Sequence, residues 1–360
     1  MSNVKNGDWK EIRNSINRQK ILVTGHTGFV GSWLCATLSH FGCDITGFSL
    51  SEDNGSLYGK IKDKLKIKSI YGDLREKKDV EVCIKEVNPD IVFHIAAYGF
   101  VKECHSNPER AYSSNVQGTL NLFEAIRDMD KPCRIVLASS DKVYRNEGAD
   151  EYLFSECDAL GGMDSYSASK TCEDILAQSY FDSYLDEKGC SLCIVRPSNI
   201  LGGGDHNMNR LIPSIYYNLS HGKKPEIRNP HSVRPWQNIF DIVDAYITLA
   251  ERVESGCAIY NVGPEPEGIK SVGEIVDYVS DLYGISSVNG KASEFGAKEK
   301  GYLGLSIDKI KEEIGWSPKR SLEETLKEIY EFYTRDNGIN TYDLCIEQIE
   351  KYFRKEDLHE

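Results

Sequence analysis

Short apolar runs alternate with segments of helical spacing along the first two hundred residues of the chain. Each run is rich in β-branched residues, as expected for strands that are buried on both faces. The runs cover residues 20–25, 44–50, 68–74, 90–97, 134–140 and 191–197. Between them apolar residues recur every three to four positions, for example at Phe29, Trp33, Leu34 and Leu38. This alternation predicts the α/β class, with a Rossmann-type, doubly wound parallel sheet covered by helices on both faces.

The pattern changes after residue 198. Glycines and prolines mark loops up to residue 235, and helical spacing returns at 239–252, 272–282 and 322–333. We expect a large domain made of 1–198, with 236–262 returning to it, and a smaller α/β C-terminal lobe made of 199–235 and 263–360. The acidic, lysine-rich tail at 342–360 is expected to be a surface helix with a frayed end.

The first predicted strand runs into the sequence TGHTGFVG, residues 24–31. Gly25 permits a tight turn, Gly28 lets backbone N–H groups approach a pyrophosphate, and Gly31 allows the following helix to pack closely on the strand. Because the glycines stand between a strand and a helix, the motif indicates a dinucleotide cofactor and not merely a glycine-rich turn.

The end of the second strand indicates which dinucleotide binds. Ser49 stands near its tip, Glu52 and Asp53 follow, and no arginine or lysine occurs before Lys60. An arginine here would favour a 2′-phosphate, so the sequence favours NAD over NADP. Asp73, after the third strand, has two interpretations: a carboxylate that accepts from the adenine amino group, or a strand-end cap.

Two further motifs contain groups suited to acid–base chemistry. In YSASK, Tyr166 and Lys170 share one helix face, and the ammonium would lower the pKa of the phenol enough to make it a usable base. In SSDKVY, Asp141 and Lys142 stand side by side where a buried strand ends. Buried charges must be paired or used, so this pair is either catalytic or a structural ion pair.

Composition narrows the function classes. The chain has 360 residues and a formal net charge of −13, which argues against nucleic-acid binding. No apolar run is long enough to span a membrane, and the N-terminus lacks the apolar core of a signal peptide, so we expect a cytoplasmic protein. The 11 cysteines are scattered, which is typical of reduced thiols, and no pattern of metal ligands stands out.

Taken together, TGxxGxxG, the aspartate of GDL, HIAA, SSDK and YxxxK resemble the extended short-chain dehydrogenase/reductases that act on nucleotide sugars. The segments LGGMDSYSASK, SNILGGGD, RLIP and RNPHSVRPWQ resemble the 4,6-dehydratases of that family, in particular those that act on CDP-glucose. The resemblance extends from about residue 20 to 263, and more loosely through LSIDKIKEEIGWSP at 305–318. It implies oxidation of the sugar at C4, elimination of water across C5 and C6, and return of hydride to C6.

The resemblance also implies roles for individual residues. The residues that would contact NAD are Gly25, Thr27, Gly28, Phe29, Val30, Gly31, Ser49, Asp73, Leu74, Ala96, Ala97, Tyr98, Asn115, Tyr166 and Lys170. The residues that would bind the nucleotide sugar are Ser140, Asn199, Arg210 and Arg234. The catalytic group would consist of Ser140, Asp141, Lys142, Tyr166 and Lys170, with Lys142 as the base for C5 and Asp141 as the acid for the C6 oxygen.

Two alternatives to a dehydratase of CDP-glucose were considered. Segments 98–102 and 143–146 depart from the family pattern, and the first faces the sugar in relatives, so a 4-epimerase or a dehydratase of another nucleotide sugar is one alternative. A non-catalytic NAD or nucleotide-sugar sensor is another, although such a sensor has no use for the base. The family also implies a homodimer, joined through helices at about 111–127 and 166–188.

Overall fold

A seven-stranded parallel sheet forms the centre of the molecule, with strand order β10-β7-β5-β4-β1-β2-β3. The computed structural model describes residues 16–53, 55–148, 151–225, 227, 229–285, 301–336 and 338–353. Its strands are β1 (Lys20–Thr24), β2 (Asp44–Ser49), β3 (Lys68–Tyr71), β4 (Ile91–His94), β5 (Arg134–Ala138), β7 (Ser191–Pro197) and β10 (Gly256–Val262). The predicted Rossmann-type fold is confirmed, and β10, which follows the helix at 239–252, adds a seventh strand that the apolar runs did not reveal.

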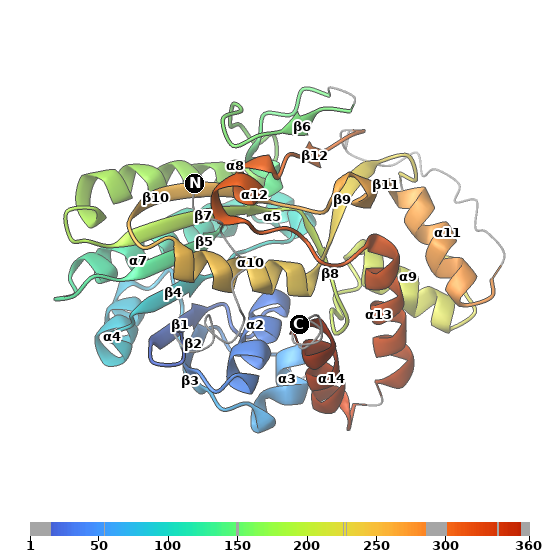
Figure 1. Ribbon diagram of the computed structural model, residues 1–360, viewed down its shortest axis with the longest axis horizontal. Coiled ribbons are helices and arrows are strands. Elements are labelled where there is room, and N and C mark those ends of the chain that lie inside the picture. The colour runs from blue at the N-terminus through green and yellow to red at the C-terminus, as the bar shows by residue number, and fades with distance from the viewer. Residues whose placement is uncertain are drawn as a thin grey trace.

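Helices cover both faces of this sheet (Figure 1). The helices on one face are α2 (Phe29–His40), α10 (Ile239–Arg252), α12 (Asp308–Ile314) and α14 (Thr341–Phe353), with α3 (Leu57–Ile61) and the turn η1 (Lys62–Lys64) beside α2 and α14. The other face holds α4 (Lys77–Val87), α7 (Gly118–Arg127), α8 (Ser165–Tyr180) and η4 (Phe181–Leu185). The segment before α7 contains α5 (Val101–Ser106), α6 (Pro108–Tyr112) and the π-helical turn η2 (Ser113–Gln117).

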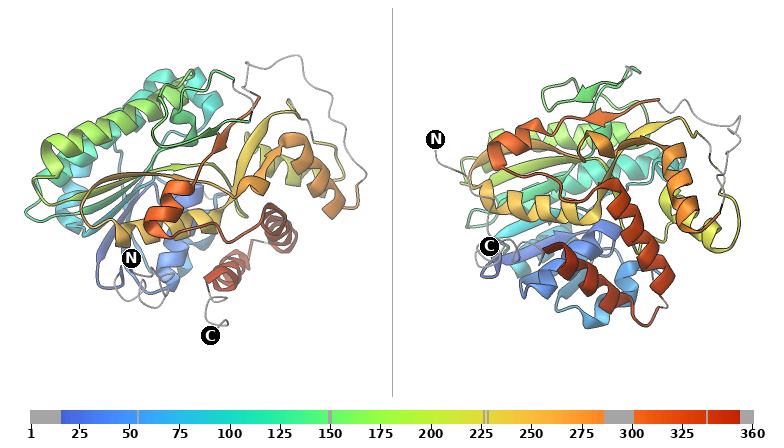
Figure 2. Two further views of the ribbon diagram at one scale, coloured as in Figure 1. Left: turned by 45° about the horizontal axis from the view of Figure 1, so that its top comes forward. Right: turned by 45° about the vertical axis from the view of Figure 1, so that its right-hand side comes forward.

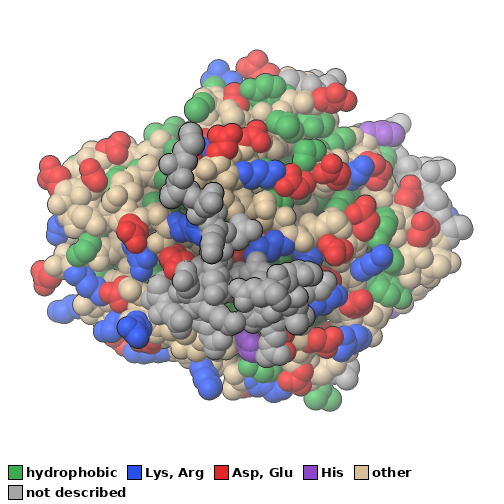
Figure 3. All heavy atoms as spheres, viewed as in Figure 1, with side chains coloured by type: hydrophobic (Ala, Val, Ile, Leu, Met, Phe, Trp, Pro, Cys, Tyr) green, Lys and Arg blue, Asp and Glu red, His purple; other side chains and the backbone are tan. Residues whose placement is uncertain are grey.

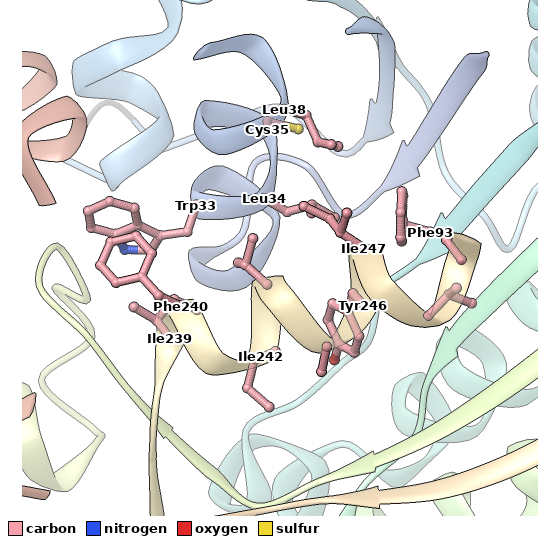
Figure 4. Close-up of a cluster of buried hydrophobic side chains, with 14 of the residues drawn as sticks. Trp33, Leu34, Cys35, Leu38, Phe93, Ile239, Phe240, Ile242, Tyr246 and Ile247 are labelled. Carbon is pink, nitrogen blue, oxygen red and sulfur yellow. The ribbon is translucent and has the colours of Figure 1, made fainter. Parts of the chain in front are cut away.

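Helix α10 is buried along almost its whole length, since residues 239–250 are all buried. It lies between the sheet, α2 and the C-terminal segments, and Figure 4 shows its side chains facing those of α2. The rings of Trp33 and Phe240 meet edge to face with centroids 4.9 Å apart. A helix enclosed in this way is apolar around most of its circumference, which explains the sequence IFDIVDAYITLA.

A smaller lobe lies beyond one end of the sheet (Figure 2). It contains a three-stranded sheet of β8 (Asn199–Leu201), β9 (Val233–Asn238) and β11 (Ile269–Ser271), together with α9 (Leu211–Ser220), α11 (Val272–Leu282) and α13 (Leu322–Arg335). Further short elements are η3 (Asp141–Val143), η5 (Pro266–Gly268), β6 (Leu153–Phe154) and β12 (Gly304–Leu305), of which β6 and β12 pair. Trp236 and Ile215 are buried in this lobe's own apolar cluster.

The helix expected in the C-terminal tail is present as α14, with an exposed charged face and a buried apolar face. In α14 the side chains of Leu344, Ile349 and Tyr352 are buried against α2 and α3, because they share one face of the helix. The tail beyond Phe353, expected to fray, lies outside the described residues. Helix α12 likewise packs on β10, and the indole of Trp316 donates to Asp244 on α10 at 2.9 Å. The proposed domain boundaries stay a prediction, although α12 packs on β10 and α14 packs on α2 and α3, which belong to the large domain.

Candidate active site

The glycine-rich turn joins β1 to the N-terminus of α2. Gly25 has a φ of +75°, and a Cβ there would lie 2.7 Å from the backbone of Ala96. A Cβ on Gly31 would lie 2.2 Å from the carbonyl oxygen of Gly25, so close packing of helix on turn requires glycine at both positions. Gly28 is the N-cap of α2 and offers no capping side chain, and Phe29 and Val30 begin the helix. The uncapped amides suit an anionic pyrophosphate.

Beside this turn, Thr27 and Ser49 connect the glycine loop to the tip of β2. Their hydroxyls are 2.8 Å apart, and Thr27 also donates to the carbonyl of Leu50 at 3.3 Å. Hydrogen bonding to Lys62 lowers the pKa of Glu52 to about 2, with Tyr71 contributing in the same direction. The ammonium of Lys62 is therefore paired with Glu52, as expected where the cofactor carries a ribose hydroxyl in place of a phosphate.

Asp73 is held by Arg75 at the end of β3. Its Oδ1 accepts from the backbone N–H of Arg75 at 3.0 Å, and its two oxygens face the guanidinium. Hydrogen bonds from Arg75 lower the pKa of Asp73. These bonds fit the strand-end cap, which is one of the two interpretations of Asp73, and the contact with adenine stays a prediction. The carbonyl of the neighbouring Leu74 accepts from Asn121 at 2.8 Å, which fixes the turn.

The segment after β4 is tied to α8 through Asn115. This buried side chain in η2 accepts from the N–H of Tyr98 at 2.7 Å and donates to Ser169 at 2.9 Å. The π-helical turn therefore brings the end of β4 and the helix of the YxxxK motif together. Ala96 and Ala97 lie at this strand end, and Ala97 is exposed.

Tyr166 and Lys170 lie on the first turns of α8, which starts with an Asp164 capping box. Burial raises the pKa of Tyr166 well above its usual value, while a hydrogen bond with Ser140 lowers it. Lys170 Nζ donates to the carbonyl of Ala138 at 2.7 Å and forms a fully buried ion pair with Glu173. The phenol is therefore protonated in the protein alone, and extra positive charge is needed to make it a base.

A buried chain of hydrogen bonds continues from Glu173 into the sheet. Thr119 Oγ1 donates to Glu173 Oε1 at 3.0 Å and lies 2.8 Å from His94 Nε2. His94 Nδ1 is 2.7 Å from Thr24 Oγ1, at the end of β1. These partners were not predicted from the sequence. The signal that could have found Glu173 is its position three residues after Lys170 on the same helix.

Asp141 and Lys142 form η3 immediately after β5 and Ser140. Lys142 Nζ lies 3.1 Å from Asp141 Oδ1 and donates to Asn199 Oδ1 at 3.2 Å. Among the described residues, Asp141 Oδ2 and Asn199 Nδ2 are buried without a hydrogen-bond partner. Because buried polar atoms are nearly always bonded, these two point to a polar ligand. The pair was predicted from the sequence, and its contact with Asn199 was not.

Buried hydrogen bonds of Arg196 fix the position of the segment SSDKVY, which contains Asp141 and Lys142. The guanidinium makes two bonds of 2.9 Å to Asp174 and one of 3.0 Å to the hydroxyl of Tyr144. Asp174 also accepts from Ser139 at 2.7 Å. All of these groups are buried, so the ion pair holds SSDKVY rigidly against α8.

The two arginines expected to bind the nucleotide sugar lie in different surroundings. Arg210, the N-cap of α9, pairs with Asp205 at 2.8 Å, and its guanidinium lies 4.8 Å from the ring centre of Phe100. Phe100 belongs to the segment that departs from the family pattern. Arg234, on β9, donates to the carbonyls of Val233 and Gly301. No hydrogen bond among the described residues joins it to Arg210 or Asn199.

The fold and the geometry of this site are those of a protein family that binds NAD. The family model described as "NAD dependent epimerase/dehydratase family" matches residues 21–263, and the chain belongs to that family. NAD is accordingly its cofactor, and the turn at Gly25–Gly31 fits the pyrophosphate as described above. The expected membership of the extended short-chain dehydrogenase/reductases is confirmed.

Individual relatives make the comparison more specific. The chain is 34% identical over 333 residues to a CDP-glucose 4,6-dehydratase from Salmonella typhimurium, covering 89% of this chain and 92% of that one. The structure of a dTDP-glucose 4,6-dehydratase from Bacillus anthracis in complex with NAD matches with a TM-score of 0.75 and 26% identity, covering 88% and 96%. A UDP-glucose 4-epimerase from Thermotoga maritima with UDP-glucose matches with a TM-score of 0.77, and at 21% identity over 88% and 98% it shows the fold alone.

The described residues contain no group of three or more His, Cys, Asp or Glu side chains arranged to hold a metal ion. Within the same residues, no helix has the length and apolar character needed to cross a membrane.

Proposed function

We propose that this protein is an NAD-dependent 4,6-dehydratase that converts a nucleotide-diphosphate hexose, CDP-glucose in the first place, into the 4-keto-6-deoxyhexose. The acid–base pair Asp141 and Lys142 beside Ser140 and Tyr166 is the observation that carries this proposal. The similarity to a CDP-glucose 4,6-dehydratase supports the choice of nucleotide. An epimerase inverts C4 and needs no second acid–base pair.

Oxidation at C4 is assigned to Tyr166, Ser140 and Lys170. NAD supplies the hydride acceptor and a positive nicotinamide ring. Tyr166 removes the O4 proton, and Ser140 hydrogen-bonds O4 and orients it. Lys170 is held by Ala138 and Glu173, so its ammonium stays in one position about one turn of α8 beyond Tyr166. The positive charges near the phenol oppose the effect of burial and bring its pKa down towards the working pH.

Elimination of water is assigned to Lys142 and Asp141. The 4-ketone acidifies the C5 proton, which Lys142 removes as a neutral amine. Asp141 protonates the C6 oxygen as it leaves. Lys142 Nζ lies 3.1 Å from Asp141 Oδ1, within reach of direct proton transfer. Transfer of one proton within the pair produces both required forms, and a substrate that excludes water favours this neutral state.

Substrate binding is assigned to Asn199, Arg210 and Arg234. The free Nδ2 of Asn199 lies beside Lys142 and suits a sugar or phosphate oxygen. The guanidinium of Arg210 suits the diphosphate, since its fork matches phosphate oxygens. Phe100, which lies in the segment 98–102 that departs from the family pattern, packs on the guanidinium of Arg210. This departure therefore affects the position of a side chain that is assigned to the diphosphate.

The proposal is tested with purified protein, NAD and a panel of CDP-, dTDP-, UDP- and GDP-linked glucose and related hexoses. The absorbance of a 4-keto product in base should appear with CDP-glucose first. Product from another nucleotide would correct the substrate and keep the reaction. A 4-epimer without keto product would establish the epimerase, and binding without turnover would establish the sensor.

A further inference from the structure

Arg210 is held by side chains from three separate segments of the chain. Its guanidinium carbon lies over the ring of Phe100, 4.8 Å from the ring centre, and over the ring of Phe29 at 5.9 Å. Its Nη1 donates to Asp205 Oδ2 at 2.8 Å. Phe29 is the first residue of α2, Phe100 immediately precedes α5, and Asp205 lies between β8 and α9. The side chain therefore lies where the cofactor turn, the segment after β4 and the smaller lobe come together.

The carboxylate that pairs with Arg210 is itself fixed in position. Asp205 is buried, and its Oδ1 accepts from the backbone N–H of Asn207 at 3.2 Å. Its carbonyl oxygen accepts from the hydroxyl of Tyr333 on α13. One corner of the guanidinium is thus attached to a rigid part of the smaller lobe, and the aromatic rings decide how the rest of the group is turned.

These contacts leave much of the guanidinium edge unused. A guanidinium has five N–H donors along its edge, whereas an aromatic ring covers its flat face and takes none of them. Within the described part of the chain, the bond to Asp205 is the one hydrogen bond that the side chain of Arg210 donates. This side chain is 38% exposed, so a ligand can reach it. The remaining donors suit the oxygens of a diphosphate.

We propose that Phe100 is a positioning residue, which through its contact with Arg210 turns the free guanidinium edge towards the diphosphate of the nucleotide sugar. This inference rests on the proposed function, which assigns Arg210 to that diphosphate. A guanidinium that is already held over a ring loses less conformational freedom when the ligand binds. The contact is the same in the ground state and in the transition state, so it contributes to substrate binding and not to the rate of the chemical steps.

The pyrophosphate of NAD is a second diphosphate for which this arginine could be held. Phe29 lies in the turn that is assigned to that pyrophosphate. However, the nearer ring is that of Phe100, outside the turn, and the ion pair joins Arg210 to the smaller lobe. These contacts favour the nucleotide sugar, and binding measurements with both ligands distinguish the two sources.

The test measures dissociation constants of the full-length protein for CDP and for NAD. Phe100→Leu should weaken CDP binding about three- to tenfold, as expected for the loss of one cation–π contact, and should leave NAD binding unchanged. With the nucleotide sugar, KM should rise and kcat should stay within about twofold of wild type. Phe100→Tyr keeps a ring and should keep the wild-type values. Tyr217→Leu, a similar change at an exposed ring farther along α9, is the control and should also match wild type.

A double-mutant cycle shows whether Phe100 acts through Arg210. Arg210→Met removes the cation and should weaken CDP binding by itself. In this background Phe100→Leu should cause no further loss, because the partner of the ring is absent. Equal losses in both backgrounds would overturn the proposal. So would an unchanged affinity for CDP in Phe100→Leu, or a loss of affinity for NAD in its place.

Failure of this inference is distinct from failure of the proposed function. If wild type forms the 4-keto-6-deoxy product but Phe100 and Arg210 show no coupling in CDP binding, the positioning role is wrong and the dehydratase stands. If wild type forms no such product from any nucleotide sugar, the proposed function is wrong, and the role of Phe100 in it falls as well.

Discussion

Charged side chains at the candidate site differ in how completely they are paired. Lys170 with Glu173 and Arg196 with Asp174 are ion pairs of almost no exposure. Removal of one partner from such a pair leaves a buried charge and costs more than the contact itself. Asp141 is buried as well, but its partner Lys142 is 30% exposed. The exposed member of this second pair is thus accessible to a substrate.

Asp141→Asn and Lys142→Met test the elimination at this scale. Each variant removes one acid–base group and keeps a similar shape, so NAD binding should persist. Formation of the 4-keto-6-deoxy product should fall by a factor of about a hundred or more. Lys68→Met, which breaks the exposed pair with Glu86 at the opposite end of the sheet, is the matched control and should keep full activity. Near-normal turnover in both site variants would contradict the assigned elimination.

His94 makes stability depend on pH. Burial lowers its pKa from 6.5 to about 3, with Lys170 contributing. Below pH 6.5 the imidazole takes up a proton in the unfolded chain, whereas in the folded chain it stays neutral down to about pH 3. The free energy of unfolding therefore decreases as the pH falls from 6.5 towards 3.

Urea unfolding of wild type and His94→Gln at about pH 7.5 and about pH 5 measures this effect. Lowering the pH should cost wild type about 2 kcal/mol more than the variant. His221→Gln, a change of an exposed histidine after α9, is the control and should follow wild type. Parallel losses in wild type and His94→Gln would show that the buried ring carries no linked proton.

At the scale of elements, α14 shows how a strongly charged segment joins the core. Its charged residues occupy one face, while Leu344, Cys345, Ile349 and Tyr352 occupy the other and cover α2 and α3. The hydroxyl of Tyr352 also donates to Asp241 of α10 at 2.6 Å. Since α2 begins at the glycine-rich turn, the tail supports the cofactor helix from its outer side.

Truncation of a buried side chain in α14 should therefore destabilise the whole large domain. Ile349→Ala should lower the free energy of unfolding by about 2–5 kcal/mol, as for other buried Ile and Leu positions. Asp343→Ala, whose carboxylate is 70% exposed in its ion pair with Lys64, should cost less than about 1 kcal/mol. Urea unfolding measures both. Equal small losses would mean that the helix docks only loosely.

At the scale of the whole molecule, the outer face of α8 and η4 exposes apolar side chains. Ile175 is 53% and Tyr184 48% exposed, although both lie on an otherwise well-packed helix. On the face seen in Figure 3, acidic and basic side chains are interspersed over the described residues and form no continuous basic surface there. The helices at about 111–127 and 166–188 are the ones that the family resemblance assigns to a dimer, and the exposed side chains favour this assignment.

Sedimentation at micromolar concentration should accordingly give a dimer. Ile175→Glu places a charge in the proposed seam and should shift the protein to monomer, because a charge buried without a partner is costly. Val82→Glu, a change at a 55% exposed residue on α4, is the control and should leave the dimer intact. A wild-type monomer at this concentration would refute the dimer.

The sequence by itself determined the Rossmann-type sheet and the glycine-rich cofactor turn. Strand and helix periods are local, so six strands and the helices at 239–252, 272–282 and 322–333 could be located from spacing alone. The glycines at 25, 28 and 31 were equally informative: the positive φ of Gly25 and the closeness of Gly28 and Gly31 to the carbonyl oxygen of Gly25 are local demands, although the contact of Gly25 with Ala96 is not. The charged pair at 141–142, for which the acid–base role stays a prediction, was visible because two charges follow a buried strand.

Only the tertiary structure decided how these groups are paired. Asn199 contacts Lys142, which is 57 residues away in the sequence, and Thr119 contacts Glu173, which is 54 residues away. No local sequence pattern predicts contacts over such separations. The same holds for β10, which pairs with β7, and for α14, which packs on helices some three hundred residues earlier. These contacts depend on the packing of the whole chain. A buried polar group needs a hydrogen-bond partner and a buried apolar surface needs close contacts, and either can come from any segment that the fold places beside it.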